Sequence, residues 1–252
     1  MKYILFEAGP VTVYSYGLMI ALGVILTFVV AQKRAKNYGL DPDAIFYMGA
    51  WGLLAGILGA KLLFYLTEIK EIIKDPSLLL NVSEGFVVYG GIIGGILGAY
   101  IYAKIKKIDI LAYFDLAVPS IAFAQGFGRI GCLLAGCCYG KETSGAFSIT
   151  FHTSAFAPNG VALVPTQIYS SILDFLHYGL LLLILRSQKK DGETAAAYLI
   201  FYSAGRFVLE FFRGDLARGS VGVLSTSQFI SVFTFLAGIV LLVQRKHALE
   251  RV

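Results

Sequence analysis

Long apolar segments alternate with short polar ones along the whole chain. A membrane-spanning helix needs about 20 mostly apolar residues. Seven segments meet this requirement, at residues 13–31, 44–66, 86–105, 111–130, 166–185, 195–212 and 225–243. The pattern therefore predicts an all-α polytopic membrane protein with seven transmembrane helices, built as a single integral membrane domain over residues 1–252.

The basic residues indicate an orientation, because loops on the cytoplasmic side carry an excess of Lys and Arg. With the N-terminus outside and the C-terminus cytoplasmic, the inner segments hold twelve of the 21 basic residues and the outer segments hold six. The inner set is Lys33, Arg34, Lys36, Lys104, Lys106, Lys107, Arg186, Lys189, Lys190, Arg245, Lys246 and Arg251. The outer set is Lys2, Lys70, Lys74, Lys141, Arg213 and Arg218. We predict this orientation in the cell (cytoplasmic or inner) membrane.

Two segments outside or at the edge of the spans need separate interpretation. The first span ends in Lys33 and Arg34 without a small-residue cleavage site, so we expect a retained helix rather than a cleaved signal peptide. The longest extramembrane segment, 131–165, falls outside between helices four and five. We expect a small extracytoplasmic lobe there, with a short strand near 148–151.

Composition supports the membrane assignment and excludes two other classes. The chain is 57% hydrophobic and only 15% charged, with a mean hydropathy of +0.74. Soluble domains have about 25% charged residues, and disordered chains have low hydrophobicity. The net charge of +5 is scattered between apolar blocks and forms no basic stripe, so we expect no nucleic-acid partner.

Charged residues within the spans gather toward one side. A charge at the centre of a span costs about 2.5–3.5 kcal/mol on insertion scales, so such residues face a partner or a water-filled cavity. The predicted orientation places Lys61, Arg129 and Arg206 toward the outer side, with Glu210 one helical turn after Arg206. Arg206 and Glu210 form either a simple ion pair or part of a shared cavity. Three cations against one carboxylate favour a cavity for an anionic group such as phosphate, with Tyr202 on the same face.

Tyrosines and glycines also lie at the predicted outer rim. Tyr16 is near the outer end of the first span, and Tyr89 lies near the outer start of the third. Gly90 and Gly91 follow Tyr89 within a glycine-rich run. Close helix packing explains most such glycines. Gly90 and Gly91 have a second potential use, since they would let a lipid headgroup approach the backbone closely.

The segment 125–141, QGFGRIGCLLAGCCYGK, combines glycines with all three cysteines. So many glycines predict a broken or re-entrant backbone lining a cavity. Three interpretations of Cys132, Cys137 and Cys138 stay open. They are candidate reactive thiols, Cys132 forms a disulfide with Cys137 or Cys138, or all three are small apolar packing groups. No further Cys or nearby His completes a ligand set, so we expect no metal site and no cofactor. For Asp115 and Asp174 we expect buried hydrogen bonds between helices.

Five motifs in this order resemble the prolipoprotein diacylglyceryl transferase family over most of the chain. They are YSYGLMIALG, YGGIIGG, GRIGCLLAGCCYGK, PTQIYSS and GRFVLEFFRGD. The family has seven spans and transfers a diacylglyceryl group from phosphatidylglycerol to the lipobox cysteine of a secreted precursor, releasing glycerol phosphate. The resemblance implies the same activity, with phosphatidylglycerol and a lipobox-containing precursor as partners.

The resemblance also implies residue roles. Arg129 and Arg206 match the arginines that hold the anionic lipid, and Glu210 matches the carboxylate that orients the second arginine. Tyr89 stands at a catalytic position that is usually histidine. The remaining substrate-binding positions are Tyr16, Lys61, Gly90, Gly91, Gly140 and Tyr202.

Four positions depart from the family pattern. Besides Tyr89, Cys132 replaces an asparagine, Cys137 replaces a glutamate and Lys61 replaces an arginine. These changes indicate a divergent, cysteine-rich branch. They leave open a related lipid-modifying enzyme with another acceptor or with a cysteine nucleophile. A lipid-binding, lipid-transporting or thiol redox-sensing membrane protein is the non-enzymatic alternative.

Overall fold

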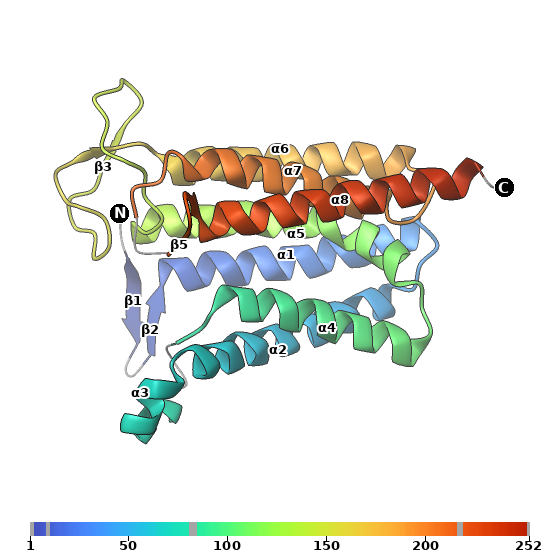
Figure 1. The fold of residues 1–252 in the computed structure, drawn as a ribbon, viewed down its shortest axis with the longest axis horizontal. Helices are drawn as coiled ribbons and strands as arrows, with labels where there is room; N and C mark the ends of the chain where they lie inside the picture. Colours follow the sequence, from blue (N-terminus) through green and yellow to red (C-terminus); the bar gives the residue numbers. More distant parts are fainter. Residues whose placement is uncertain (1–2, 9–10, 81–84, 216–218, 251–252) are drawn as a thin grey trace. The chain divides into compact units, whose positions relative to one another are not determined.

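The computed structural model describes residues 3–8, 11–80, 85–215 and 219–250, and is dominated by helices (Figure 1). Lys2, Arg218 and Arg251, which the charge count assigned to the loops and tails, lie outside these residues. The helices are α1 (Ser15–Asn37), α2 (Pro42–Thr67), α3 (Ile69–Lys74), η1 (Pro76–Leu79), α4 (Val88–Lys106), α5 (Ile110–Ala135), α6 (Thr166–Ser187), α7 (Glu193–Glu210) and α8 (Thr226–Glu250). The strands pair as three antiparallel hairpins: β1 (Ile4–Ala8) with β2 (Val11–Tyr14), β3 (Ile149–Thr150) with β4 (Ala162–Leu163), and β5 (Ser220–Val221) with β6 (Leu224–Ser225).

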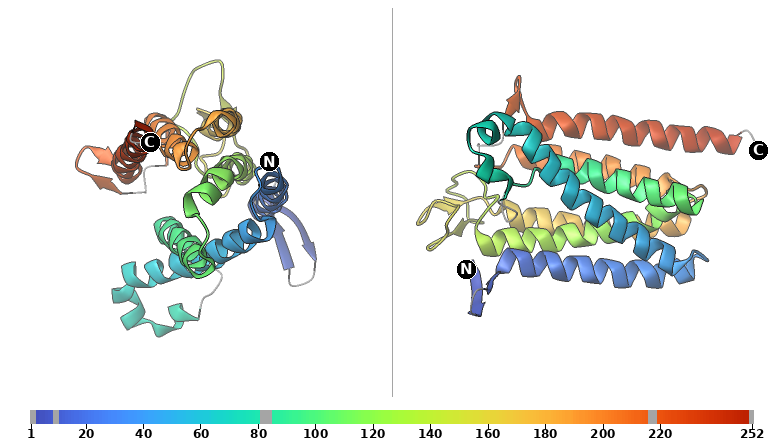
Figure 2. Two further views of the ribbon diagram at one scale, coloured as in Figure 1. Left: turned by 90° about the vertical axis from the view of Figure 1, so that its right-hand side faces the viewer. Right: turned by 90° about the horizontal axis from the view of Figure 1, so that it is seen from below.

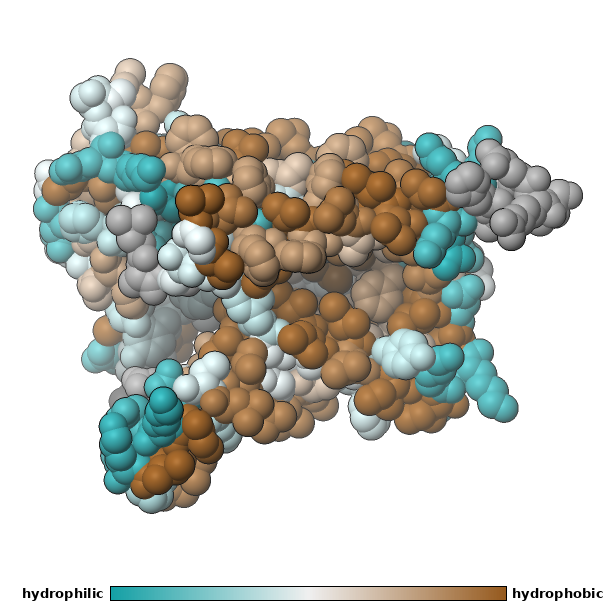
Figure 3. Space-filling view, viewed as in Figure 1, coloured by the Kyte–Doolittle hydropathy of each residue, from teal (hydrophilic) through white to brown (hydrophobic). Residues whose placement is uncertain are grey.

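Each of the seven predicted spans corresponds to one long helix. Among the described residues, six helices are long and apolar enough to cross a membrane: α1, α2, α4, α5, α6 and α8. The remaining helix, α7, carries Glu193, Arg206 and Glu210 within its 18 residues. Apolar residues cover the helix faces drawn in Figure 3, and side chains such as Leu58 and Val88 are 71% and 72% exposed. Large apolar surfaces of this kind face lipid, and the predicted all-α membrane class is confirmed.

The chain forms two compact units, of which the first comprises residues 1–30 and 114–252. Within it α7 packs against both α6 and α8, and the views of Figure 2 agree on this arrangement. Two side-chain hydrogen bonds attach α5 to its neighbours. Thr27 Oγ1 of α1 donates to the carbonyl of Ser120 (2.9 Å), and Ser171 Oγ of α6 donates to the carbonyl of Gly126 (3.1 Å).

Helix α5 is continuous, so the prediction of a broken backbone from residue 125 is wrong for the segment up to Ala135. Two of its glycines allow neighbouring side chains to pack directly on the helix. A Cβ on Gly126 would lie 2.7 Å from the ring of Phe175, and one on Gly131 would lie 3.1 Å from the ring of Tyr16. The glycines therefore provide close packing without interrupting the helix. The chain leaves the helix only at Gly136, whose φ is +79°.

A small folded segment follows α5. Its strands β3 and β4 pair in register, Ile149 with Leu163 and Thr150 with Ala162. Phe151, Ala157 and Leu163 form a buried apolar cluster beneath the hairpin. The strand expected near 148–151 is therefore present, although it is only two residues long.

The buried carboxylate Asp115 connects α5 to the start of α7. It accepts hydrogen bonds from the backbone N–H groups of Gly192 (2.5 Å) and Ala195 (2.7 Å). The first N–H groups of a helix have no partner within the helix, and a carboxylate satisfies them well. Asp115 thus makes the buried inter-helix hydrogen bonds that we expected.

The second unit comprises residues 31–113, and its main feature is the packing of α2 against α4. Glycines line both sides of this contact. A Cβ on Gly94 would lie 3.1 Å from Gly59 Cα, and one on Gly98 would lie 2.7 Å from the carbonyl of Trp51. Small residues let helix backbones approach this closely in membranes, which explains much of the glycine run.

Candidate functional site

A cavity of about 360 Å³ lies among α5, α6 and α7 in the first unit. Its polar wall consists of Arg129, Ser170, Asp174, His177, Tyr202 and Arg206. Leucines and a phenylalanine of α6 and α7 form the apolar remainder: Leu173, Leu176, Leu180, Phe201 and Leu209. Its volume falls in the range of small-molecule sites, about 300–1,000 Å³. The combination of cationic and apolar walls suits an amphipathic anion.

Arg206 and Glu210 form the predicted ion pair, at 2.7 Å between Arg206 Nη2 and Glu210 Oε2. Both side chains are largely buried, with exposed fractions of 13% and 9%. Arg206 Nη2 also donates to Ser227 Oγ at 3.0 Å, so α8 helps to fix its orientation. A guanidinium held from two sides presents its remaining donors in a defined direction.

Arg129 lies opposite Asp174, with 4.0 Å between Arg129 Nε and Asp174 Oδ2. At this distance the two groups form an ion pair but are too far apart for a hydrogen bond. Sequence reasoning assigned Asp174 to a helix–helix hydrogen bond and missed this pairing. Two carboxylates, Asp174 and Glu210, therefore accompany the two arginines. Lys61, the third cation of the prediction, belongs to the second unit.

Aromatic rings stack along one wall of the cavity. Tyr202 stacks on Tyr198 with a centroid distance of 5.7 Å, and Tyr198 stacks on His177 at 5.3 Å, each with an interplanar angle of 9°. Tyr202 and Arg206 both line the cavity, as predicted, and the contact of Tyr202 with a substrate stays a prediction. Tyr16, on α1, lies within electrostatic range of Arg129 and of the three cysteines.

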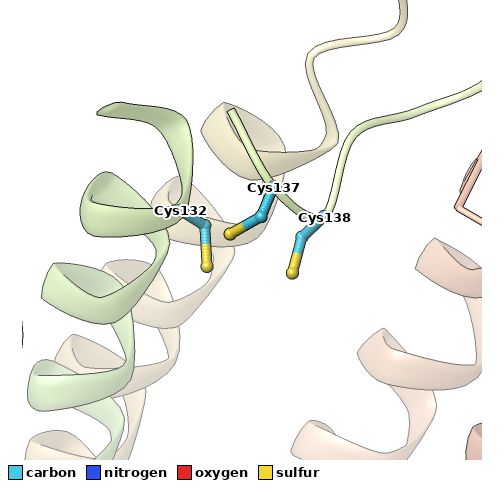
Figure 4. Close-up of side chains that lie close together, drawn as sticks. All are labelled: Cys132, Cys137 and Cys138. Carbon is cyan, nitrogen blue, oxygen red and sulfur yellow. The ribbon is translucent and has the colours of Figure 1, made fainter. Parts of the chain in front are cut away.

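The three cysteines form a compact group at the end of α5 (Figure 4). Cys132 belongs to α5, whereas Cys137 and Cys138 lie on the segment that follows it. Their sulfur atoms all lie within 4.8 Å of one another, and all three residues are free thiols. The disulfide alternatives are therefore not adopted. The expectation of no metal site stays a prediction.

Hydrogen bonds from the beginning of α6 hold the backbone of this group. Thr166 Oγ1 donates to the carbonyl of Cys138 and Gln167 Nε2 donates to the carbonyl of Cys137, both at 2.9 Å. Hydrogen bonds with Cys132 and Cys138, together with burial, raise the pKa of the Cys137 thiol above its ordinary value. A thiol with a raised pKa is a poor nucleophile at neutral pH, which disfavours the cysteine-nucleophile alternative.

Gly140 joins the cysteine segment to the chain beyond α7. The N–H of Lys141 donates to the carbonyl of Phe212 (2.9 Å), and the N–H of Gly214 donates to the carbonyl of Tyr139 (3.0 Å). A Cβ on Gly140 would lie 2.7 Å from Val164 Cβ. The structure therefore gives Gly140 a packing reason, and its predicted contact with substrate stays a prediction.

The other predicted site residues belong to the second unit. Lys61 lies over the rings of Phe64, Tyr65 and Phe86, at 5.2, 5.1 and 5.3 Å from their centroids. Tyr89 is the second residue of α4, and Gly90 and Gly91 follow on the side of α2. The predicted roles of Lys61, Tyr89, Gly90 and Gly91 toward a substrate stay predictions.

Two further polar groups near the site were not singled out from the sequence. Arg213 makes a bidentate ion pair with Asp215, at 2.9 and 2.6 Å, directly after α7. The motif GRFVLEFFRGD contains both residues, so their spacing of two was the available signal. His177 lines the cavity as well, and a titratable side chain within a predicted span was the available signal for it.

Known proteins of one family are similar to this chain over nearly its whole length. A family model described as prolipoprotein diacylglyceryl transferase matches residues 3–244. A phosphatidylglycerol–prolipoprotein diacylglyceryl transferase of Clostridium tetani is 51% identical over 239 residues, covering 95% of this chain and 96% of the relative. A second, from Clostridium perfringens, is 49% identical and covers 96% and 94%, and one from Finegoldia magna is 32% identical and covers 98% and 96%. The chain therefore belongs to the prolipoprotein diacylglyceryl transferase family.

Proposed function

We propose that this chain transfers the diacylglyceryl group of phosphatidylglycerol to the cysteine thiol of a prolipoprotein, and that the cavity among α5, α6 and α7 binds the lipid phosphate. The relatives carry this activity in their names, at up to 51% identity over nearly the full length. The observation that carries the site assignment is the presence of two largely buried guanidiniums, from α5 and α7, in one cavity with apolar walls.

The two guanidiniums match the chemistry of the leaving group. The acceptor thiolate attacks the glyceryl carbon next to the phosphate, an S–C bond forms, and the C–O bond to phosphate breaks. Glycerol phosphate leaves, and its phosphate changes from a singly charged diester to a monoester with greater negative charge. Arg129 and Arg206 stabilise this increase because guanidiniums bind phosphate oxygens through parallel hydrogen bonds. The acceptor's proton passes to the solvent or to the released phosphate.

Glu210 and Ser227 act on Arg206 rather than on the lipid. Their contacts of 2.7 and 3.0 Å restrict the guanidinium to one orientation before the lipid arrives. Groups that are oriented beforehand do not need to reorganise during the reaction. The apolar wall then accommodates the glyceryl backbone and the first part of the acyl chains.

The test is mass spectrometry of a lipobox peptide incubated with phosphatidylglycerol and purified protein. Arg129→Ala and Arg206→Ala should each lower the yield of diacylglyceryl peptide at least about 100-fold, the usual cost of losing one transition-state hydrogen-bond donor. Arg186→Ala, which removes an exposed arginine at the end of α6, is the matched control and should keep its activity. Turnover close to wild type in either cavity variant would refute the phosphate assignment.

A further inference from the structure

The three cysteines have the composition and proximity of a metal-binding group. Their sulfur atoms lie within 4.8 Å of one another, and thiolates bound to one zinc ion at about 2.3 Å lie at comparable separations. Among the described residues, this is the one group of three or more His, Cys, Asp or Glu residues whose ligand atoms meet in this way. Three soft ligands select a thiophilic cation such as zinc over magnesium or calcium.

The backbone places the sulfur atoms in advance. Cys138 has a φ of +59°, in the left-handed region that residues with a side chain rarely adopt. The hydrogen bonds from Thr166 and Gln167 hold the carbonyls on each side of the sulfur-bearing turn, and the N–H of Cys137 donates to the carbonyl of Cys132 at 3.1 Å. A strained conformation maintained by surrounding bonds is typical of functional sites.

Two guanidiniums lie beside this group. Arg129 interacts electrostatically with Cys132 and Cys138. Arg213, already paired with Asp215, also hydrogen-bonds the Cys138 side chain. A divalent cation with three thiolates carries a net charge of −1, which these cations would stabilise. Simple apolar packing of three cysteines needs no such charged neighbours.

We propose that Cys132, Cys137 and Cys138 bind one thiophilic divalent cation of the zinc type through three thiolates, and that its fourth coordination position receives the acceptor thiol. The binding of the acceptor thiol at the fourth position rests on the proposed function. Three protein ligands and one open position are the arrangement of catalytic zinc sites. Arg129 connects the two parts, because it lines the lipid cavity and lies beside the cysteines.

The chemistry of this site balances without an oxidant. Binding of the cation releases the three protons of the cysteine thiols. The acceptor thiol then replaces water at the fourth position and loses its own proton to solvent, since a thiol bound to such a cation is deprotonated. Its sulfur attacks the glyceryl carbon, the thioether forms, and glycerol phosphate departs. The cation would thus supply the acceptor thiolate at neutral pH.

The first measurement is metal content and cobalt binding of protein purified without oxygen. Co²⁺ should bind at about one per chain and give the near-ultraviolet thiolate-to-cobalt absorption of a sulfur-rich tetrahedral site. Cys132→Ser, Cys137→Ser and Cys138→Ser should each lose most of this absorption. His152→Ala, in the following loop and outside the cysteine group, is the control for unspecific binding and should keep it. Thermal unfolding verifies that the variants are folded.

The second measurement separates the metal site from the transfer reaction. Adding a cysteine-containing lipobox peptide to the Co²⁺ protein, without lipid, should shift the visible absorption bands, whereas the serine version of the peptide should not. This readout needs no turnover, so it stands even if the proposed transferase activity fails. Absence of the thiolate–cobalt absorption, insensitivity of the bands to the cysteine peptide, or a disulfide in the anaerobic protein would each overturn the proposal.

Discussion

The packing of α4 on α2 makes opposite predictions for two adjacent glycines. A Cβ added to Gly90 would lie 2.6 Å from Leu63 Cβ and 2.9 Å from the carbonyl carbon of Gly59, with the oxygen of Gly59 closer still. A Cβ added to Gly91 would lie 3.5 Å from the oxygen of Gly56 and 3.6 Å from Ala60 Cβ, which are ordinary contacts. Gly90→Ala should therefore separate the helices, and Gly91→Ala should fit.

The magnitudes follow from two opposing terms. Overpacking costs about 1–3 kcal/mol. The cost at Gly90 lies near the upper end, because the atoms that its added Cβ would meet are backbone atoms or are bonded directly to the backbone. Replacing a helical glycine by alanine stabilises the helix by about 0.5–1 kcal/mol. The sum is a loss of about 1–2 kcal/mol for Gly90→Ala and a small gain for Gly91→Ala.

Equilibrium unfolding in mixed micelles with increasing sodium dodecyl sulfate, followed by circular dichroism, measures both variants under identical conditions. The free energy of unfolding should fall for Gly90→Ala and remain at or above the wild-type value for Gly91→Ala. Equal free energies of unfolding of the two variants would refute the conclusion that the close approach of α2 requires a glycine at position 90.

Two further predictions concern buried carboxylates. Glu210→Gln keeps the side-chain shape and removes the charge beside Arg206, so transfer should fall about 10–100-fold. Glu71→Gln is the control, because it affects only an exposed ion pair with a lysine. Unchanged transfer in Glu210→Gln would mean that the Arg206–Glu210 ion pair serves only membrane insertion. Asp115→Ala leaves two buried N–H groups of α7 without their acceptor and should lower the free energy of unfolding by about 2–3 kcal/mol. Asp109→Ala removes an exposed acceptor at the start of α5 and should cost only about 0.5–1 kcal/mol, so equal losses would contradict the role of burial.

The helices and the central ion pair were predictable from sequence because both depend on short-range spacing. A run of about 20 apolar residues forms a helix in lipid whatever its neighbours are, since the backbone has no other hydrogen-bonding partner there. Arg206 and Glu210 are four residues apart on one helix, so their proximity follows from helical geometry. Arg129 was noticed as a charge within a predicted span, and the family motifs added its role toward the anionic lipid.

Long-range proximity was decided by the tertiary structure alone. Asp174 belongs to α6, and the sequence did not indicate that it faces Arg129 of α5. The glycines of α5 suggested a broken backbone, yet they admit the rings of Phe175 and Tyr16 from other helices. Glycine favours both outcomes locally, and the packing partner selects between them.

The cysteines illustrate the same division. Their sequence spacing left a disulfide, a reactive thiol and plain packing open, because spacing does not specify where side chains point. The end of α5 at Ala135, the left-handed turn at Cys138 and the hydrogen bonds from α6 bring the three sulfur atoms together. Apolar content and local periodicity thus determined the class and the helices of this protein, whereas contacts between distant segments determined which polar groups share a cavity and which thiols share a site.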